Sequence, residues 1–231
     1  MDTPIYLNMK IFFASIAALT LVFFSCTSLK PRETVPAAEN QAPVPETVPQ
    51  IPEPEVPEVP KVPELPRGPE YIMGKGTVPA EKLAAFLMKN NPNSDNDFVI
   101  SLSALYVEEA AAEGVNHDTA FAQMCLETGF LRYGGLVVPE MNNFCGLGAI
   151  GPQEPGHAFA DPRTGVRAHI QHLQAYAATG PLNQDLVDPR YRYVKRGVSP
   201  TIHGLSGTWA ADRLYSEKIA AILKRLYEFD Y

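Results

Sequence analysis

Apolar residues recur with helical periodicity only in the last two thirds of the chain, where they predict five helices. Val166, Ile170, Leu173 and Ala177 follow one another at spacings of four, three and four residues, which places them on one helix face. Asn90-Asn91-Pro92 ends the first helix, because proline does not continue it. The predicted helices cover residues 79–90, 101–115, 119–127, 166–177 and 212–227.

A different pattern separates the third and fourth of these helices. Residues 139–165 are rich in proline and glycine and have no long apolar period, so they predict an irregular lobe, or a short hairpin. The expected fold is therefore a mainly helical domain over residues 70–231 with one short irregular or hairpin lobe. A domain of this length is able to bury one core.

The chain begins with a short apolar run that is typical of an export signal. Residues 11–24 carry no charge and follow Lys10, but a membrane-spanning helix needs about 20 apolar residues. The Ser25-Cys26 pair after the run resembles the end of a bacterial lipoprotein signal, in which the cysteine is lipidated. We therefore expect a lipoprotein-type signal peptide over residues 1–26 with lipidation at Cys26. An ordinary cleaved signal with an incidental cysteine is the alternative.

A proline-rich segment follows the signal. Residues 27–69 hold 12 of the 22 prolines of the chain. Prolines two or three residues apart favour polyproline II and leave too few apolar side chains for a core, so this segment predicts a disordered tether. A ligand for an aromatic groove is another interpretation of such a segment. A tether agrees better with an exported domain that a lipid anchors in the cell envelope.

The charge balance excludes one class of function. The net charge of −7 leaves no excess of lysine and arginine for contacts with phosphates. We therefore expect no nucleic-acid partner.

Glu127 is the residue that points most clearly to chemistry. It ends a short apolar helix and stands directly before Thr128-Gly129, where the chain turns. Burial beside the helix and the negative end of the helix dipole both favour the protonated carboxyl, which is able to donate its proton to a leaving oxygen. Glu127 is therefore a candidate general acid; an ordinary glutamate at a helix end is the alternative.

Two sequence patterns surround this glutamate. Residues 123–129, Gln-Met-Cys-Leu-Glu-Thr-Gly, match Gln-x-x-x-Glu-Ser/Thr-Gly, and residues 142–148 match Asn-Asn-Phe-x-Gly-Ile/Leu. In this order the patterns resemble those of the bacterial glucosaminidase family of peptidoglycan hydrolases, in its compact branch. Residues 165–177, 187–191 and 209–219 extend the resemblance, which covers about residues 71–230.

The resemblance implies a lysozyme-like fold and cleavage of the β-1,4 bond after N-acetylglucosamine in the glycan strands of peptidoglycan, with Glu127 as general acid. It implies that the Asn143 amide binds the acetamido group of the sugar and that Phe144 stacks on a sugar face. Trp209 and Tyr215 stand where the family has tyrosines, and we expect Trp209 to contact substrate. Tyr215 is expected either to contact substrate or to be buried at helical spacing. Indole cannot replace phenol in proton transfer, so no catalytic role is carried over to Trp209.

A second carboxylate is the feature that this resemblance leaves unassigned. Most glycosidases place two carboxyl groups about 5–5.5 Å apart for retention or about 6.5–9.5 Å apart for inversion. The candidates in the lobe are Glu140, Glu154 and Asp161, and Asp161 is also placed to start a turn before Pro162. Without such a group, a lytic transglycosylase or attack by the substrate's own acetamido group is an alternative. A non-catalytic wall-binding lipoprotein is a third hypothesis.

The remaining candidate residues favour structural roles. His169 and His172 share a helix face, but no third ligand has matching spacing, so we expect no metal and no organic cofactor. Cys125 and Cys145 are compatible with a disulfide in an exported domain or with buried free thiols. We expect the protein to be a monomer.

Overall fold

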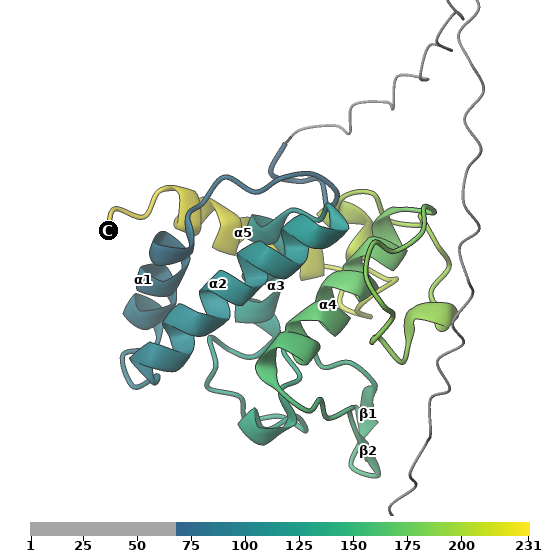
Figure 1. Ribbon diagram of the computed structural model, residues 1–231, viewed down its shortest axis with the longest axis horizontal. Coiled ribbons are helices and arrows are strands. Elements are labelled where there is room, and N and C mark those ends of the chain that lie inside the picture. The colour runs from purple at the N-terminus through teal and green to yellow at the C-terminus, as the bar shows by residue number, and fades with distance from the viewer. Residues whose placement is uncertain (1–67) are drawn as a thin grey trace, which may run out of the picture. The chain divides into compact units, whose positions relative to one another are not determined.

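The computed structural model describes residues 68–231 (Figure 1). The expected signal peptide over residues 1–26, the expected lipidation site Cys26 and the expected tether as far as residue 67 lie outside the described residues. Within residues 68–231, no helix is long and apolar enough to cross a membrane.

Five α-helices build this part of the chain, close to the predicted ranges. α2 begins at Asn96 rather than Ser101, because Asp95 caps it by accepting a hydrogen bond from the backbone N–H of Phe98 over 3.0 Å. α5 begins at Tyr215 rather than at the predicted residue 212. The helices are α1 (Ala80–Asn90), α2 (Asn96–Glu113), α3 (His117–Glu127), α4 (Pro162–Ala177) and α5 (Tyr215–Tyr227).

The lobe between α3 and α4 contains a short hairpin. The 3₁₀-helix η1 (Pro139–Met141) precedes β1 (Ala149–Gly151) and β2 (Glu154–Pro155), which pair in an antiparallel sheet. Two further 3₁₀-helices, η2 (Tyr191–Tyr193) and η3 (Ile202–Leu205), lie between α4 and α5. The prediction of a mainly helical domain with a short hairpin lobe is confirmed.

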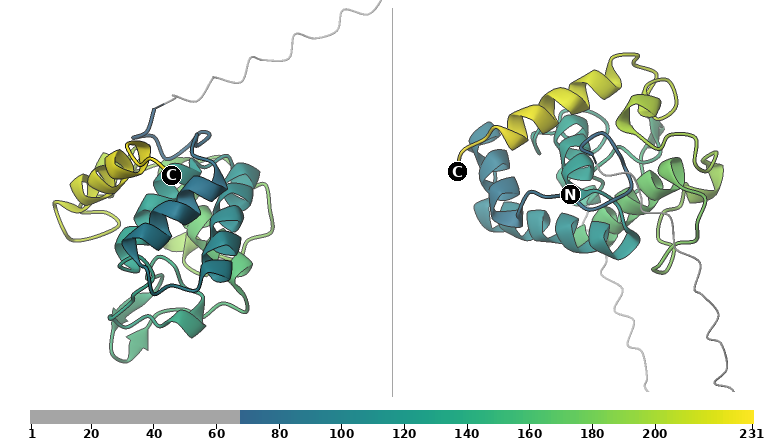
Figure 2. Two further views of the ribbon diagram at one scale, coloured as in Figure 1. Left: turned by 90° about the vertical axis from the view of Figure 1, so that its left-hand side faces the viewer. Right: turned by 90° about the horizontal axis from the view of Figure 1, so that it is seen from above.

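The core lies where the helices cross. α2 packs against α1 and α4, and α5 lies across α3 (Figures 1 and 2). Leu102 and Tyr106 of α2 and Phe121 of α3 have no exposed surface. Truncating a buried aromatic side chain to alanine costs about 3–5 kcal/mol, so these rings contribute strongly to the stability of the domain.

Charged groups fix α4 against α2. Glu109 of α2 is only 2 % exposed, and its carboxylate accepts hydrogen bonds from Arg163 over 2.6 Å and from Arg167 over 2.8 Å. Both arginines lie in the first half of α4. Because a buried carboxylate without partners is costly, this pairing determines how α4 lies beside the rest of the core.

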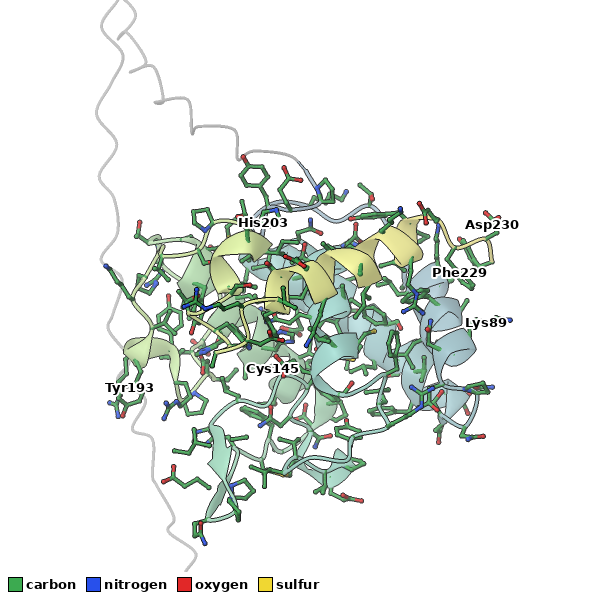
Figure 3. The ribbon with its side chains drawn as sticks, turned by 180° about the vertical axis from the view of Figure 1, so that it is seen from behind. Lys89, Cys145, Tyr193, His203, Phe229 and Asp230 are labelled. Atoms are coloured by element: carbon green, nitrogen blue, oxygen red, sulfur yellow. The ribbon has the colours of Figure 1, made fainter. Side chains whose placement is uncertain are left out.

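Both ends of the described chain are held against other parts of the domain. Near the start, the Ile72 N–H donates to the carbonyl of Pro200, and the Ile202 N–H donates to the carbonyl of Glu70. After α5, Phe229 packs on Phe86 of α1 with 5.6 Å between ring centroids, which brings the C-terminal residues against α1 (Figures 2 and 3).

Candidate active site

Glu127 is the last residue of α3, at the point where a buried helix meets an open pocket. The nine residues from His117 to Cys125 are all buried. Asn116 caps the start of the helix by accepting a hydrogen bond from the N–H of Asp118 over 3.0 Å. The negative end of the helix dipole therefore lies beside the Glu127 carboxyl.

Two neutral donors from the last part of the chain reach one oxygen of Glu127. The indole N–H of Trp209 donates to Oε1 over 3.2 Å, and the hydroxyl of Tyr215 donates to the same oxygen. Tyr215 is the first residue of α5 and is 5 % exposed, whereas Trp209 lies in the preceding loop and is half-buried. Because α5 crosses α3, both donors converge on the end of α3.

The surroundings of Glu127 favour its protonated form. The side chain is exposed at the mouth of the pocket, but the protein surrounds its carboxyl closely enough for desolvation to raise its pKa. The hydrogen bonds from Tyr215 and Trp209 lower this pKa, because they favour the charged form, and desolvation prevails. Glu127 therefore keeps its proton to a higher pH than an ordinary glutamate, as a general acid requires.

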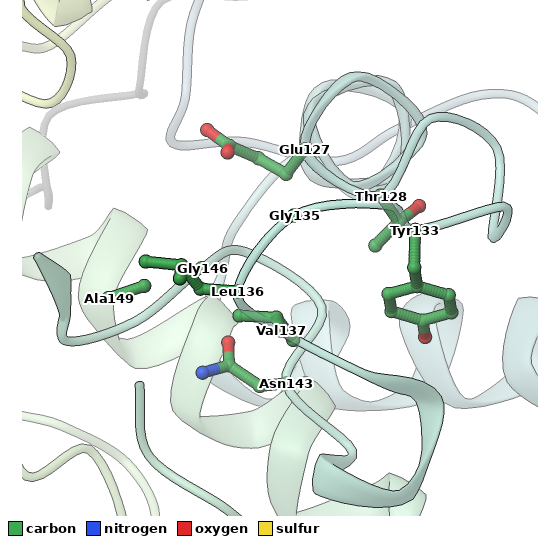
Figure 4. A pocket seen from close by; sticks show the side chains of 9 residues that line it. All are labelled: Glu127, Thr128, Tyr133, Gly135, Leu136, Val137, Asn143, Gly146 and Ala149. Atoms are coloured by element: carbon green, nitrogen blue, oxygen red, sulfur yellow. The ribbon is translucent and has the colours of Figure 1, made fainter. Parts of the chain in front are cut away.

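A cavity of about 190 Å³ opens beside this carboxyl (Figure 4). Its wall combines the end of α3 with the turn that follows it and with the loop before β1. Glu127 is the one carboxylate among the described residues that line it. The lining residues are Glu127, Thr128, Tyr133, Gly135, Leu136, Val137, Asn143, Gly146 and Ala149.

The turn after Glu127 has an unusual backbone. Phe130, Leu131 and Tyr133 have φ angles of 58°, 61° and 57°, in the left-handed region that costs energy for residues other than glycine. Thr128 holds the turn, since its Oγ1 accepts from the N–H of Leu131 over 2.9 Å and its carbonyl accepts from the N–H of Tyr133 over 2.8 Å. Tyr133 thereby joins the pocket wall, where burial raises its pKa to about 12.

Asn143 organises the loop on the other side of the pocket. Its Oδ1 accepts from the N–H of Leu147 over 2.9 Å, and its Nδ2 donates to the carbonyls of Leu147 and His157 over 3.0 and 2.9 Å. Gly146 follows with φ of 67°, and a Cβ there would lie 3.7 Å from Oε2 of Glu127. A side chain at this position would therefore narrow the pocket beside the carboxyl.

Protein surrounds the two residues of this loop, Asn143 and Phe144, that were expected to contact a sugar. Asn143 lines the pocket, but it is 1 % exposed and backbone groups of its own loop engage its amide. Phe144 is also 1 % exposed, and its ring packs beside Phe98 and Tyr106 in the core. The structure therefore gives Phe144 a packing role in place of the expected stacking on a sugar, because its ring faces are covered by protein.

None of the three candidates for a second carboxylate lines this pocket in the described structure. Asp161 is the N-cap of α4: its Oδ1 accepts from the N–H of Thr164 over 2.9 Å, and this bond lowers the pKa of the carboxyl. Glu140 lies in η1 and Glu154 in β2, and both are exposed. Glu127 therefore has no carboxylate partner among the described residues that line the pocket.

Three rings surround the Trp209 indole. The centroids of His172, Tyr176 and His169 lie 4.9, 5.2 and 5.9 Å from that of Trp209. This packing holds the indole N–H toward Glu127. Among residues 68–231, no group of three or more histidine, cysteine or acidic side chains is placed to bind a metal ion.

The two cysteines of the domain are free thiols. Cys125 and Cys145 are both buried, and burial raises the pKa of each thiol (Figure 3 labels Cys145). Each therefore behaves as a small apolar side chain, which was one of the two sequence-based expectations.

Sequence reasoning missed two residues of the site. Gln123 donates from Nε2 to the Tyr215 hydroxyl over 2.7 Å. Its position four residues before Glu127, one helical turn away, was a signal that both side chains share a face. Tyr133 had no comparable signal, because its place in the wall depends on the left-handed turn.

Comparison with known proteins relates this arrangement to a family. Residues 103–228 match the family described as mannosyl-glycoprotein endo-beta-N-acetylglucosaminidase, or Glucosaminidase. An uncharacterised protein of Borreliella burgdorferi is 41 % identical over 160 residues, which are 69 % of this chain and 78 % of that protein. The crystal structure of S. aureus autolysin E in complex with the muropeptide NAM-L-Ala-D-iGlu has a TM-score of 0.46 at 13 % identity, over 69 % of this chain and 71 % of that one. Because the family match spans more than half of the chain, the protein belongs to the glucosaminidase family of glycoside hydrolases.

Proposed function

We propose that the protein is a peptidoglycan hydrolase that cleaves the β-1,4 bond after N-acetylglucosamine, with Glu127 as general acid. The observation that carries the proposal is the Glu127 carboxyl itself. It faces a pocket of about 190 Å³, desolvation raises its pKa, and two hydrogen-bond donors are fixed beside it. Membership of the glucosaminidase family supports the bond type.

In the first step Glu127 gives its proton to the glycosidic oxygen. The bond between that oxygen and C1 of the sugar breaks, and its electron pair stays with the leaving oxygen. Glu127 becomes a carboxylate, which accepts the hydrogen bonds of Trp209 and Tyr215. These donors are already in place, so they stabilise the charge without reorganisation.

The group that attacks C1 belongs to the substrate in this proposal. Glu127 has no carboxylate partner among the described residues that line the pocket, which favours attack by the carbonyl oxygen of the sugar's 2-acetamido group. This attack forms a cyclic intermediate. Water then attacks C1 and opens the new ring that the acetamido oxygen had formed. The Glu127 carboxylate takes one proton from this water, which restores the acid.

The same observation favours a second candidate, a lytic transglycosylase. There a hydroxyl of the sugar itself attacks C1 instead of water, and the product is an anhydro-sugar. One acid–base residue suffices for either route, so the products have to distinguish them.

The test is digestion of purified cell wall, followed by mass analysis of the fragments and of their reducing ends. Reducing N-acetylglucosamine supports the proposal, and retention of the β-configuration supports attack by the acetamido group. Reducing N-acetylmuramic acid would contradict the bond assignment, and anhydro-sugars would favour the transglycosylase. Wall binding without fragments at any pH would favour a non-catalytic wall-binding protein.

We further propose that the protein is exported and anchored in the envelope by a lipid on Cys26, with residues 27–69 as the tether between the anchor and the catalytic domain. A Cys26→Ser variant should lose label from a fatty-acid analogue and leave the membrane fraction. A Cys145→Ser variant is the matched control, since Cys145 is buried inside the domain. Equal labelling of the Cys26→Ser variant and the wild type would contradict the anchor.

A further inference from the structure

A line of hydrogen-bonded side chains leads from the core to Glu127. It begins at Tyr106 of α2, whose hydroxyl lies 2.9 Å from Nδ1 of His169 in α4. Nε2 of His169 lies 3.0 Å from Oε1 of Gln123, and Nε2 of Gln123 lies 2.7 Å from the Tyr215 hydroxyl. Tyr215 then bonds to Glu127. We call these five residues the relay.

The relay is shielded from water except at its end. Tyr106, His169 and Gln123 have no exposed surface, and Tyr215 is 5 % exposed. Four helices contribute to it, so its geometry depends on the whole helical core. In a buried line of this kind every donor needs an acceptor, because an unpaired buried donor costs about 1–3 kcal/mol.

This requirement decides which partner donates in each hydrogen bond of the relay, and all the bonds then point in one direction, from Tyr106 toward Glu127. The Tyr106 hydroxyl has no hydrogen-bond partner other than His169 in the described structure, so it must donate to Nδ1. A nitrogen that accepts carries no proton, so His169 carries its proton on Nε2 and donates to Oε1 of Gln123. The Gln123 amide is thereby oriented and donates from Nε2 to the Tyr215 oxygen. The hydrogen of Tyr215 is left to bond to Glu127.

The charge state of His169 agrees with this direction. Burial lowers its pKa to about 3, so the ring is neutral at any ordinary pH. A neutral imidazole accepts at one nitrogen and donates at the other, as the relay needs. A charged ring would donate from both nitrogens and would leave the Tyr106 hydroxyl without an acceptor.

The opposite direction of the relay would favour the protonated state of Glu127. If the Gln123 amide turned over, its oxygen would accept from Tyr215, and the Tyr215 oxygen would then need a donor. Among the described side chains that bond to the Tyr215 hydroxyl, a protonated Glu127 carboxyl is then the one able to supply it. The observed direction therefore favours the ionised carboxylate, against the desolvation that raises the pKa of Glu127.

We propose that Tyr106, His169 and Gln123 are positioning residues that hold the Tyr215 hydroxyl as a donor to Glu127 and thereby set the upper pH limit of glycan cleavage. The proposal rests on the proposed role of Glu127 as general acid. Its chemical consequence is that the carboxylate formed when Glu127 gives up its proton meets a donor that is already oriented.

Other titratable groups near Glu127 are separate from the relay. Burial raises the pKa of Tyr133 to about 12 and that of Cys145 well above its usual value, so both stay neutral. Both lie near enough to Tyr106 to affect its pKa, but as neutral groups they carry no charge that the loss of the Tyr106 hydroxyl would change. The groups concerned are Tyr133 of the turn after α3, Cys145 of the pocket loop, and the His172–Asp188 pair beside Trp209.

The test is a Tyr106→Phe variant of the full chain. The ring stays, packed against Phe121 at 5.6 Å, and only the hydroxyl that gives the relay its direction is lost. In the wild type only the reverse direction leaves a buried group unpaired, whereas in this variant either direction leaves Nδ1 of His169 unpaired. The preference for the observed direction therefore weakens, and Glu127 should keep its proton to higher pH. We expect the alkaline limb of the pH–kcat profile to move up by about one pH unit with KM unchanged.

A matched control removes a hydroxyl outside the relay. Tyr227 donates to Asp118 over 3.1 Å, and Tyr227→Phe loses this bond without touching the line to Glu127. A merely structural effect would act alike in both tyrosine variants, whereas the relay predicts a shifted limb only for Tyr106→Phe.

Substitution of His169 gives a second and independent test. His169→Gln offers one acceptor and one donor about as far apart as the two ring nitrogens, so it should restore the limb of the wild type. His169→Leu offers neither and should shift the limb as Tyr106→Phe does. If both Tyr106→Phe and His169→Leu fold and keep the limb of the wild type, the proposal is wrong.

A readout without turnover separates this proposal from the proposed function. A ¹³C NMR titration of labelled glutamate carboxyls, with the Glu127 signal assigned by its absence in Glu127→Gln, gives its pKa in each variant. An inactive wild type would overturn the proposed function. The relay would still be supported by a higher Glu127 pKa in Tyr106→Phe, and contradicted by an unchanged one.

Discussion

The indole Nε1 of Trp209 lies 3.2 Å from Oε1 of Glu127, although 82 positions separate the two residues. Three rings hold the indole in place, so this donor is fixed before any substrate arrives. Glu127 is therefore a carboxyl with a permanent pair of donors, Trp209 and Tyr215, at the edge of an open pocket.

The first prediction concerns catalysis by Glu127. Glu127→Gln keeps the size of the side chain and an oxygen that accepts from Trp209 and Tyr215, but it removes the transferable proton. Release of glycan fragments should fall by about 100-fold or more, the usual range for acid catalysis. Binding to insoluble wall should persist, measured by co-sedimentation. Glu140→Gln, an exposed change outside the pocket, should keep full activity. An active Glu127→Gln variant would rule out the mechanism.

The same variant should change how stability depends on pH. The folded state raises the pKa of Glu127 above that of the unfolded chain. The stability linked to this shift is complete below the unfolded pKa and is lost as pH rises through the folded pKa. Glutamine carries no such loss, so the Tm of Glu127→Gln should equal that of the wild type in acid and exceed it at neutral pH. Thermal melts over a pH series measure this, and a lower Tm at neutral pH would contradict the desolvation of Glu127.

Asp161 should prove to be a helix cap rather than a second catalytic carboxylate. Its Oδ1 accepts from the backbone N–H of Thr164 at the start of α4. Asp161→Ala should lower the free energy of unfolding by about 0.5–2 kcal/mol, whereas Asp161→Asn keeps a good capping group and should lose less. Denaturant titration compares the two. Both should cleave glycan at the rate of the wild type, and an inactive but folded Asp161→Asn would restore Asp161 as a catalytic candidate.

Phe144 should contribute to stability and not to sugar binding. Its ring is 1 % exposed and packs beside Phe98 and Tyr106. Phe144→Leu keeps most of the volume, so the domain should fold with a loss of about 1–2 kcal/mol. Binding of the folded variant to glycan fragments should equal that of the wild type in calorimetry. A clear loss of affinity at unchanged stability would show that the ring does reach the sugar.

The thiols of Cys125 and Cys145 should remain unpaired in the folded protein. Alkylation of the denatured protein without reductant, followed by peptide mass mapping, should label both residues. In the folded protein both should react slowly, because they are buried and their raised pKa keeps the thiolate scarce. A peptide pair linked through these two cysteines would contradict the structure.

Much of the fold was already predictable from the sequence. Several signals act between residues close in the chain: the apolar period of α4, the Asn116 cap before α3 and the Asn90-Asn91-Pro92 stop at the end of α1. Hydrogen bonds and side-chain periodicity within one helix are local, so a single sequence carries them. Helix starts were less certain: α2 begins five positions before its predicted start, because the Asp95 cap outweighs the later apolar pattern.

The sequence by itself determined that Glu127 ends an apolar helix beside a glycine, with Gln123 one turn earlier on the same face. Only the tertiary structure decided what surrounds that carboxyl. The crossing of α5 over α3 brings Tyr215 and Trp209 to it, and the position of α4 places His169 between Tyr106 and Gln123. The physical reason is that these contacts join residues 46 to 88 positions apart. Their geometry depends on how whole helices pack, which no local pattern encodes.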